Sequence, residues 1–234
     1  MIHIHKLKKA YGEQFALTME ELQIAEGSIT GIVGNNGAGK TTLFRLILDL
    51  IEPTSGEVFI DNEPVRANDS WKSFTGSYLD EGFLIDFLKP EEYFYFTGKL
   101  YGMDEQATDQ RLSIYTRFMA GEVLGQDKFI RDMSSGNRQK TGIVAAMMVE
   151  PRLLILDEPF NYLDPSSQIW IKRLLKEDNE ARKTTMLISS HNLTHLAEIC
   201  NRIVLLERGR VIKDLSLPAD DPAEVERYFS MQAE

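Results

Sequence analysis

The chain has 234 residues, of which 43% are hydrophobic and 26% are charged. These values are ordinary for one globular domain that buries a core, and no low-complexity tract suggests disorder. The formal net charge of −10 at pH 7 repels nucleic acid phosphates, so direct binding to nucleic acid is not expected.

No apolar run approaches the roughly 20 residues that span a bilayer, and the start MIHIHKLKKAYG lacks the apolar stretch of a signal peptide. The single cysteine, Cys200, cannot form an internal disulfide, which fits a reducing compartment. A cytoplasmic location is therefore expected, with Cys200 filling the core from a short helix.

The first segment alternates, with Ile2 and Ile4 set apart from His3 and His5. A second extended segment follows at about 15–24, and together the two predict an antiparallel layer. Two histidines this close can indicate a metal site, but in an exposed strand they are more often only solvated.

From Ile29 the pattern changes to an apolar strand, ITGIVG, a glycine-rich turn and a helix over 40–50. GEVFID adds a strand. LLILDEP and TMLISSH are apolar runs of the kind that parallel sheets bury on both faces. The fold class predicted is α/β, a doubly wound core with a mostly parallel sheet.

Between about 81 and 134 the strand signal fades, and Pro90 with two glutamates after it marks a helix start, which predicts an inserted helical subdomain. RIVLLERGRVIKDL predicts a hairpin around Gly209, and Asp221 with Pro222 can start a last helix. The expected organisation is one domain: a core over 1–80 and 141–215, the helical subdomain over 81–140, and a C-terminal helix over 216–234.

The segment GNNGAGKTT matches the phosphate-loop pattern G-x-x-x-x-G-K-[ST], so the α/β core is predicted to be that of a P-loop NTPase. Its glycines let the backbone N–H groups turn toward phosphates, at the positive end of the following helix. Lys40 is expected to reach the β- and γ-phosphates, and Thr41 to offer its hydroxyl to Mg²⁺. The expected nucleotide-binding residues are Gly34, Asn35, Asn36, Gly37, Ala38, Gly39, Lys40, Thr41 and Thr42.

LLILDEP carries Asp157 and Glu158 at the carboxyl end of a buried strand, where ligands bind in α/β sheets. Asp157 suits the Mg²⁺ shell because a hard cation prefers oxygen, and Glu158 suits a general base for the attacking water. An acidic pair that only caps a helix is the alternative.

These motifs together resemble the nucleotide-binding subunits of ATP-binding cassette (ABC) transporters. DMSSGNRQK resembles the family signature L-S-G-G-Q and departs from it at three of five positions. The resemblance implies that the signature of one copy reaches the nucleotide of a second copy, so ATP, Mg²⁺ and a homodimer are expected. The signature residues are Ser134, Ser135, Gly136 and Asn137; taken alone, Ser134 would be read as a helix N-cap.

Three shorter matches follow the family order. Tyr11 resembles the aromatic residue that stacks on adenine, although ordinary packing is the common alternative. NYLD, ending at Asp164, resembles the loop that communicates across the dimer. His191 resembles the histidine that contacts the γ-phosphate, and with Glu158 and Lys40 it makes up the expected catalytic set.

Glu81 in SYLDEGF stands where the family usually has a glutamine that ligates Mg²⁺, and Asp80 lies beside it. Some subunits resembling exporters carry glutamate there. The metal residues implied are Thr41, Glu81 and Asp157.

The resemblance implies a motor subunit, exporter-like by analogy, that acts at the cytoplasmic face of the membrane on permease subunits carried by separate chains. Phe83, Leu84 and Phe87 are the expected dock if they are exposed, and core residues if they are not. The alternative is an ABC-type ATPase with a non-membrane partner, such as an iron–sulfur assembly or translation factor.

Overall fold

A computed structural model describes residues 1–217, 219–221 and 223. The expected C-terminal helix falls mainly on 224–234, which lie outside the described residues. Within the described part, no helix combines the length and the apolar character that crossing a membrane requires.

The central sheet has six strands in the order β10-β9-β3-β8-β7-β6. All neighbours run parallel except the last hairpin, in which β10 pairs antiparallel with β9, as the sequence predicts. The strands are β3 (Ile29–Val33), β6 (Thr75–Tyr78), β7 (Leu153–Leu156), β8 (Thr185–Ser190), β9 (Arg202–Glu207) and β10 (Arg210–Ser216).

A second sheet is antiparallel and has the order β2-β1-β4-β5. Its strands are β1 (Ile2–Tyr11), β2 (Gln14–Ile24), β4 (Ser55–Ile60) and β5 (Glu63–Pro64). The predicted antiparallel layer is therefore confirmed, and the GEVFID strand belongs to this layer because β4 pairs with β1.

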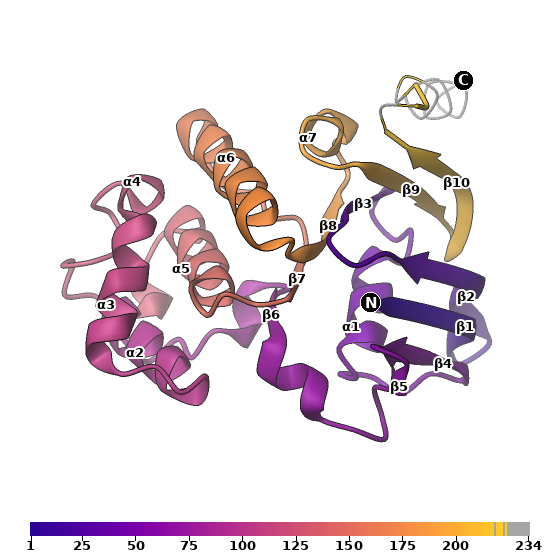
Figure 1. The fold of residues 1–234 in the computed structure, drawn as a ribbon, viewed down its shortest axis with the longest axis horizontal. Helices are drawn as coiled ribbons and strands as arrows, with labels where there is room; N and C mark the ends of the chain where they lie inside the picture. Colours follow the sequence, from indigo (N-terminus) through magenta and orange to yellow (C-terminus); the bar gives the residue numbers. More distant parts are fainter. Residues whose placement is uncertain (218, 222, 224–234) are drawn as a thin grey trace.

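Four helices gather at one end of the molecule, opposite the antiparallel sheet: α2 (Pro90–Leu100), α3 (Glu105–Ile114), α4 (Thr116–Met119) and α5 (Ser135–Met148) (Figure 1). Within the described residues, short 3-10 helices cover Ser70–Phe74, Glu81–Phe83 and Ile130–Asp132. The boundary proposed at 140 falls inside α5.

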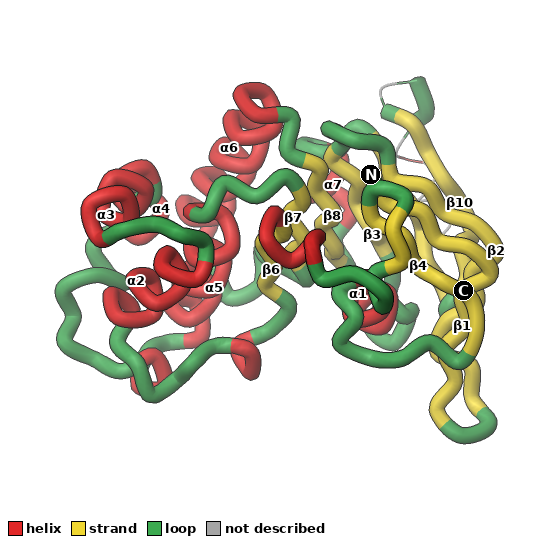
Figure 2. The backbone as a smooth tube through the Cα atoms, turned by 60° about the horizontal axis from the view of Figure 1, so that its bottom comes forward, coloured by secondary structure: helices red, strands yellow, loops and turns green. Residues whose placement is uncertain are grey.

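The helix expected over 40–50 is α1 (Lys40–Ile47), and it ends earlier because Leu48 caps it and Asp49 has a left-handed φ of 51°. In the part of the chain that the structure describes, the remaining α-helices are α6 (Pro165–Arg182) and α7 (Leu193–Ala197). Figure 2 shows α1 between the central strands and the antiparallel sheet.

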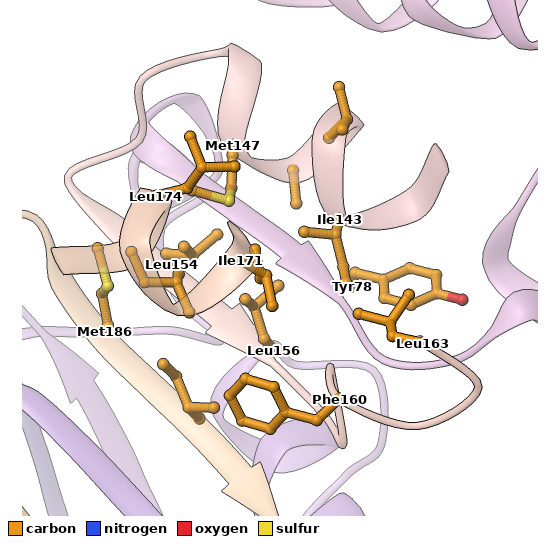
Figure 3. Close-up of a cluster of buried hydrophobic side chains, with 14 of the residues drawn as sticks. Tyr78, Ile143, Met147, Leu154, Leu156, Phe160, Leu163, Ile171, Leu174 and Met186 are labelled. Carbon is orange, nitrogen blue, oxygen red and sulfur yellow. The ribbon is translucent and has the colours of Figure 1, made fainter. Parts of the chain in front are cut away.

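Alternation along the central strands divides their side chains between two hydrophobic cores. Leu153 and Ile155 of β7 face the core that includes α1 and the antiparallel sheet. Leu154 and Leu156 face the opposite core, against α5 and α6 (Figure 3). Burial on both faces explains why this strand is uniformly apolar in sequence.

Cys200 is free and buried, as expected of a core residue, although it lies just after α7 and not within it. Burial raises the pKa of its thiol well above the usual value, so the thiolate needed for reactivity is disfavoured.

Candidate functional site

The phosphate loop joins β3 to α1, and its glycines meet specific steric demands. Gly37 and Gly39 have φ values of 81° and 104°, which side chains with a Cβ rarely adopt. A Cβ on Gly34 would lie 2.3 Å from the backbone oxygen of Leu206 in β9. Asn35, Asn36 and Gly37 are exposed at the tip of the loop, where a ligand can reach their backbone.

Lys40 is buried at the first turn of α1, beside Thr41 and Thr42. Its Nζ donates to the carbonyl oxygens of Gly34 at 2.7 Å and Asn35 at 3.3 Å. The same Nζ lies 3.2 Å from Oε1 of Glu158. The ammonium is thus held inside the curl of the loop, next to the predicted base.

Asp157 follows β7 and is buried among hydroxyl groups. Thr41 Oγ1 donates to Asp157 Oδ2 at 2.5 Å, and the Ser189 hydroxyl donates to Oδ1. Burial raises the pKa of Asp157, which means that its charged form is poorly solvated here. Ser189 is the second-last residue of β8, in the TMLISSH segment, and was not anticipated. Its position beside Asp157 depends on the pairing of β7 with β8.

Glu158 is held on both sides of its carboxylate. Its Oε2 lies 2.9 Å from Nδ1 of His191, while Oε1 faces Lys40. Its backbone N–H donates to Ser189 at 2.8 Å, and its φ of 48° is left-handed, a strained conformation for a residue with a side chain. The predicted catalytic set, Lys40, Glu158 and His191, is therefore in direct contact.

A cavity of about 310 Å³ opens beside these residues. Thr41, Glu81 and Asp157, the predicted metal residues, all line it. Glu81 is nevertheless engaged elsewhere, since Arg138 Nε of α5 donates to its Oε2 at 2.5 Å.

Gln139 connects the helical subdomain to the catalytic strand and was missed from the sequence. Its amide nitrogen donates to the carbonyl oxygen of Glu158 at 3.1 Å, and its Oε1 accepts from the Tyr78 hydroxyl at 3.1 Å. Gln139 lies within the DMSSGNRQK segment, but only tertiary packing shows what it contacts.

The signature residues lie at the start of α5. Ser134 is its N-cap and accepts from the Asn137 N–H at 3.2 Å, which agrees with the N-cap interpretation. A Cβ on Gly136 would lie 2.6 Å from the Tyr162 carbonyl oxygen, so the signature packs on the NYLD loop. Within the described part of the chain, residues 134–137, Ser135 among them, do not line the cavity beside Glu158.

Asp164 acts as the N-cap of α6. Its Oδ1 accepts from the backbone N–H groups of Ser166 at 2.9 Å and Ser167 at 3.0 Å. Hydrogen bonds from the hydroxyls of these two serines hold the pKa of Asp164 well below its usual value. The structure thus gives Asp164 a local role in starting a helix.

Tyr11 ends β1 with its side chain 53% exposed. The Lys9 Nζ lies 4.9 Å from the centroid of its ring. The ring is thus open to solvent, as a stacking platform requires.

The apolar residues after Glu81 divide between surface and core. Phe83 and Phe87 are 50% and 61% exposed, whereas Leu84 is buried. Of the two alternatives left open by the sequence, the surface holds for Phe83 and Phe87, and the core holds for Leu84, which belongs with Phe94 to the larger core.

A family model described as ABC transporter matches residues 17–161. The bacitracin transport ATP-binding protein BcrA of Enterococcus faecalis is 32% identical over 93% of this chain and 70% of its own length. The tungstate uptake system ATP-binding protein TupC of Peptoclostridium acidaminophilum is 32% identical over 90% of this chain and 96% of its own length.

Among solved structures, the ATP-binding cassette MJ0796, as a dimer in a post-hydrolysis state bound to ADP and Pi, has a TM-score of 0.83 and 26% identity. The match covers 93% of this chain and 99% of that one. The phosphate loop, the paired acids and the shared fold lead to one conclusion: the chain belongs to the ATP-binding proteins of the ABC transporter family and is an ATPase.

Proposed function

We propose that this chain is the motor subunit of an ABC transporter, in which two copies close around ATP, hydrolyse it and move separate membrane subunits. The observation that carries this proposal is the contact of Glu158 with both Lys40 and His191 beside a cavity lined by Thr41 and Asp157.

In this arrangement Glu158 acts as the general base. The Lys40 ammonium lies 3.2 Å from Oε1 of this carboxylate, and a carboxylate is a group that can accept a proton from water. His191 presents both Nδ1 at 2.9 Å and its backbone N–H at 3.3 Å to Oε2, so it fixes the direction of the carboxylate. Lys40 is free to pair with phosphate when a nucleotide enters the loop, because that pairing replaces its contact with Glu158.

The residues at the cavity fit Mg²⁺. Thr41 and Asp157 place a hydroxyl and a carboxylate oxygen 2.5 Å apart, and hard cations prefer such oxygen donors. When bound, Mg²⁺ neutralises charge on the β- and γ-phosphates. Glu81 joins this set only after releasing Arg138, so we propose that it links metal binding to the position of α5.

A second copy completes the site in this proposal. Ser134 and Gly136 mark the N-terminus of α5, where free N–H groups and the helix dipole favour an anion. They do not line the cavity of their own chain, and the structural relative MJ0796 is a dimer. The helix N-terminus of one copy therefore serves the phosphates held by the other.

The membrane partner is proposed to dock on an apolar surface between α2 and the central sheet. Phe83, Phe96 and Leu100 are exposed and line a hollow of about 250 Å³. A second hollow of about 240 Å³ also includes Phe83. Large exposed apolar side chains gathered at one place are typical of an interaction site. Docking there would hold the chain at the cytoplasmic face of the membrane.

Export is the direction we propose, because glutamate at 81 matches some exporter-like subunits. The name of BcrA, a bacitracin transport ATP-binding protein, suggests a cargo to test but no direction. TupC, with the same 32% identity, belongs to an uptake system. Inverted membrane vesicles supplied with external ATP separate the two directions. Accumulation of labelled bacitracin inside them supports export, and ATP-driven tungstate uptake by right-side-out vesicles overturns it.

Glu158→Gln tests the motor. We expect ATP binding to persist while turnover falls by ~10²–10⁴-fold, the usual contribution of a general base. The variant should accumulate as a dimer with MgATP, but not with MgADP, in light scattering. Glu177→Gln, an exposed carboxylate on α6 paired with Arg173, is the control and should hydrolyse ATP normally. Near-normal turnover in Glu158→Gln would assign the base to another residue.

Copurification from detergent-solubilised membranes tests the partner. A tagged wild-type chain should recover a hydrophobic membrane protein, and Phe83→Asp should lose it. Ile169→Asp replaces another exposed apolar residue, on α6, and should still recover the membrane protein. Recovery of soluble iron–sulfur assembly or translation proteins alone would favour the alternative function.

A further inference from the structure

Three metal-binding side chains meet on the outer face of the antiparallel sheet. Ile2 and Ile4 of β1 point into the core, so the alternating His3 and His5 point to solvent. In β2, Glu21 is the register partner of His5. The ligand atoms of these three residues all lie within 4.8 Å of one another.

The contacts within this cluster already converge on one carboxylate. Glu21 Oε2 lies 2.7 Å from His3 Nε2, and Glu21 Oε1 lies 2.5 Å from His5 Nδ1. The two imidazoles are therefore turned toward the same point and are not independently solvated.

The backbone and a neighbouring ring hold the donors in place. His3 is the register partner of Phe59 in β4, and the two rings stack at 5.9 Å with an interplanar angle of 27°. Pairing of β1 with strands on both sides fixes the spacing of the histidines. Little conformational freedom remains to be lost when the three donors bind one ion.

The geometry suits a first-row transition ion. With ligand bonds of roughly 2.0–2.2 Å, tetrahedral zinc places its donors about 3.4 Å apart. The donors of the cluster lie between 2.5 Å and 4.8 Å apart, so small side-chain rotations are enough. Imidazole nitrogen favours zinc, copper and nickel, whereas Mg²⁺ prefers oxygen, so this site would not compete for the metal of the ATP site.

We propose that His3, His5 and Glu21 form a site for a divalent transition ion, represented by Zn²⁺, which joins β1 to β2. Side-chain exposures of 41%, 44% and 54% leave the remaining coordination positions to water. The ion takes the place of the protons between the imidazoles and the carboxylate, and each proton moves to the other ring nitrogen or to water. Its role is to stabilise the antiparallel sheet, since an ion that binds only the folded chain raises its stability.

The test is a Zn²⁺ titration of the purified, nucleotide-free chain, with its affinity tag removed, against a chromogenic chelator. We expect one tight Zn²⁺ per chain. His5→Gln and Glu21→Gln should each weaken binding by at least tenfold, because even outer-shell changes at metal sites cost 10–100-fold. Zn²⁺ should raise the melting temperature of the wild type and leave that of His5→Gln unchanged.

Glu20→Gln is the matched control, because Glu20 is the adjacent exposed acid on β2 and is not in the cluster. It should bind Zn²⁺ as the wild type does. Circular dichroism without metal checks that each variant is folded, and basal ATPase activity provides a second check. Absence of stoichiometric Zn²⁺ binding overturns the proposal. Equal Zn²⁺ affinity in the wild type and His5→Gln also overturns it, and would assign the ion to the carboxylates of the ATP site.

Discussion

Gly142 allows α5 to pack directly on the ring of Tyr78, and replacing it with alanine tests that contact. A Cβ at position 142 would lie 2.1 Å from Cε2 and 2.2 Å from Cδ2 of Tyr78. Ordinary contact needs about 3.4 Å or more, so the ring must move by more than 1 Å. Tyr78 is only 3% exposed, and its ring lies beside Ile143 and Leu163 (Figure 3).

The expected stability change follows from two opposing effects. Overpacking a core costs about 1–3 kcal/mol, and the severity of this overlap places it at the upper end. Alanine in place of glycine inside a helix recovers up to about 1 kcal/mol. We therefore expect a net loss of about 2 kcal/mol for Gly142→Ala. For a chain of this size that loss lowers the melting temperature by roughly 4–8 °C.

Activity should fall as well, because the displaced ring belongs to a chain of hydrogen bonds. Burial raises the pKa of Tyr78, so its hydroxyl remains a donor to Gln139 at 3.1 Å. Gln139 in turn donates to the Glu158 carbonyl. Moving Tyr78 disturbs this link to the catalytic residue.

Thermal melts and urea titrations test whether the overlap with the Tyr78 ring causes the loss of stability. They compare four proteins: wild type, Gly142→Ala, Tyr78→Leu and the double variant. In the Tyr78→Leu background the ring is gone, so Gly142→Ala should be neutral or stabilising. A higher melting temperature for Gly142→Ala in the wild-type background would refute the reasoning, because helix propensity alone would then explain the result.

Glu81→Gln should keep hydrolysis within about tenfold, roughly 1.4 kcal/mol in the barrier. Glu81→Ala should raise the Mg²⁺ concentration for half-maximal turnover; a wild-type Mg²⁺ curve would remove Glu81 from the metal set. Tyr11→Ala should weaken ATP binding in calorimetry by about 1–3 kcal/mol if its exposed ring stacks on the base, and unchanged affinity would make it a packing residue. Asp164→Ala should lower the free energy of unfolding by about 1 kcal/mol at pH 7 through loss of the α6 cap, and Asp164→Asn by less. Since the folded pKa of Asp164 is depressed, its stabilisation is complete above the unfolded value of about 3.9 and is lost as pH falls through the lower folded value. The difference in melting temperature between the wild type and Asp164→Ala should therefore be smaller at pH 3 than at pH 7. An equal difference at the two pH values would contradict this account.

Local sequence was sufficient to predict the elements that bear the site. The phosphate loop was recognisable because its glycines, Lys40 and Thr41 are adjacent in sequence and act through the backbone that they shape. Asp157 and Glu158 were recognisable because a uniformly apolar strand must be buried and must end at the ligand edge of a parallel sheet.

Contacts between distant segments were decided only by the tertiary structure. Ser189 and Gln139 touch the catalytic acids from a neighbouring strand and from α5, and no local pattern encodes such pairings. The engagement of Glu81 by Arg138 depends likewise on how the helical subdomain packs.

The same division holds for the metal cluster and the apolar surface. Alternation in the sequence placed His3 and His5 on one exposed face, but Glu21 reaches them only through the register of β1 with β2. Hydrophobic character alone could not separate buried Leu84 from exposed Phe83 and Phe87, because burial depends on what the rest of the chain packs against each side chain. The sequence by itself determined the elements and the chemistry carried within each, and the tertiary structure decided which of these groups meet.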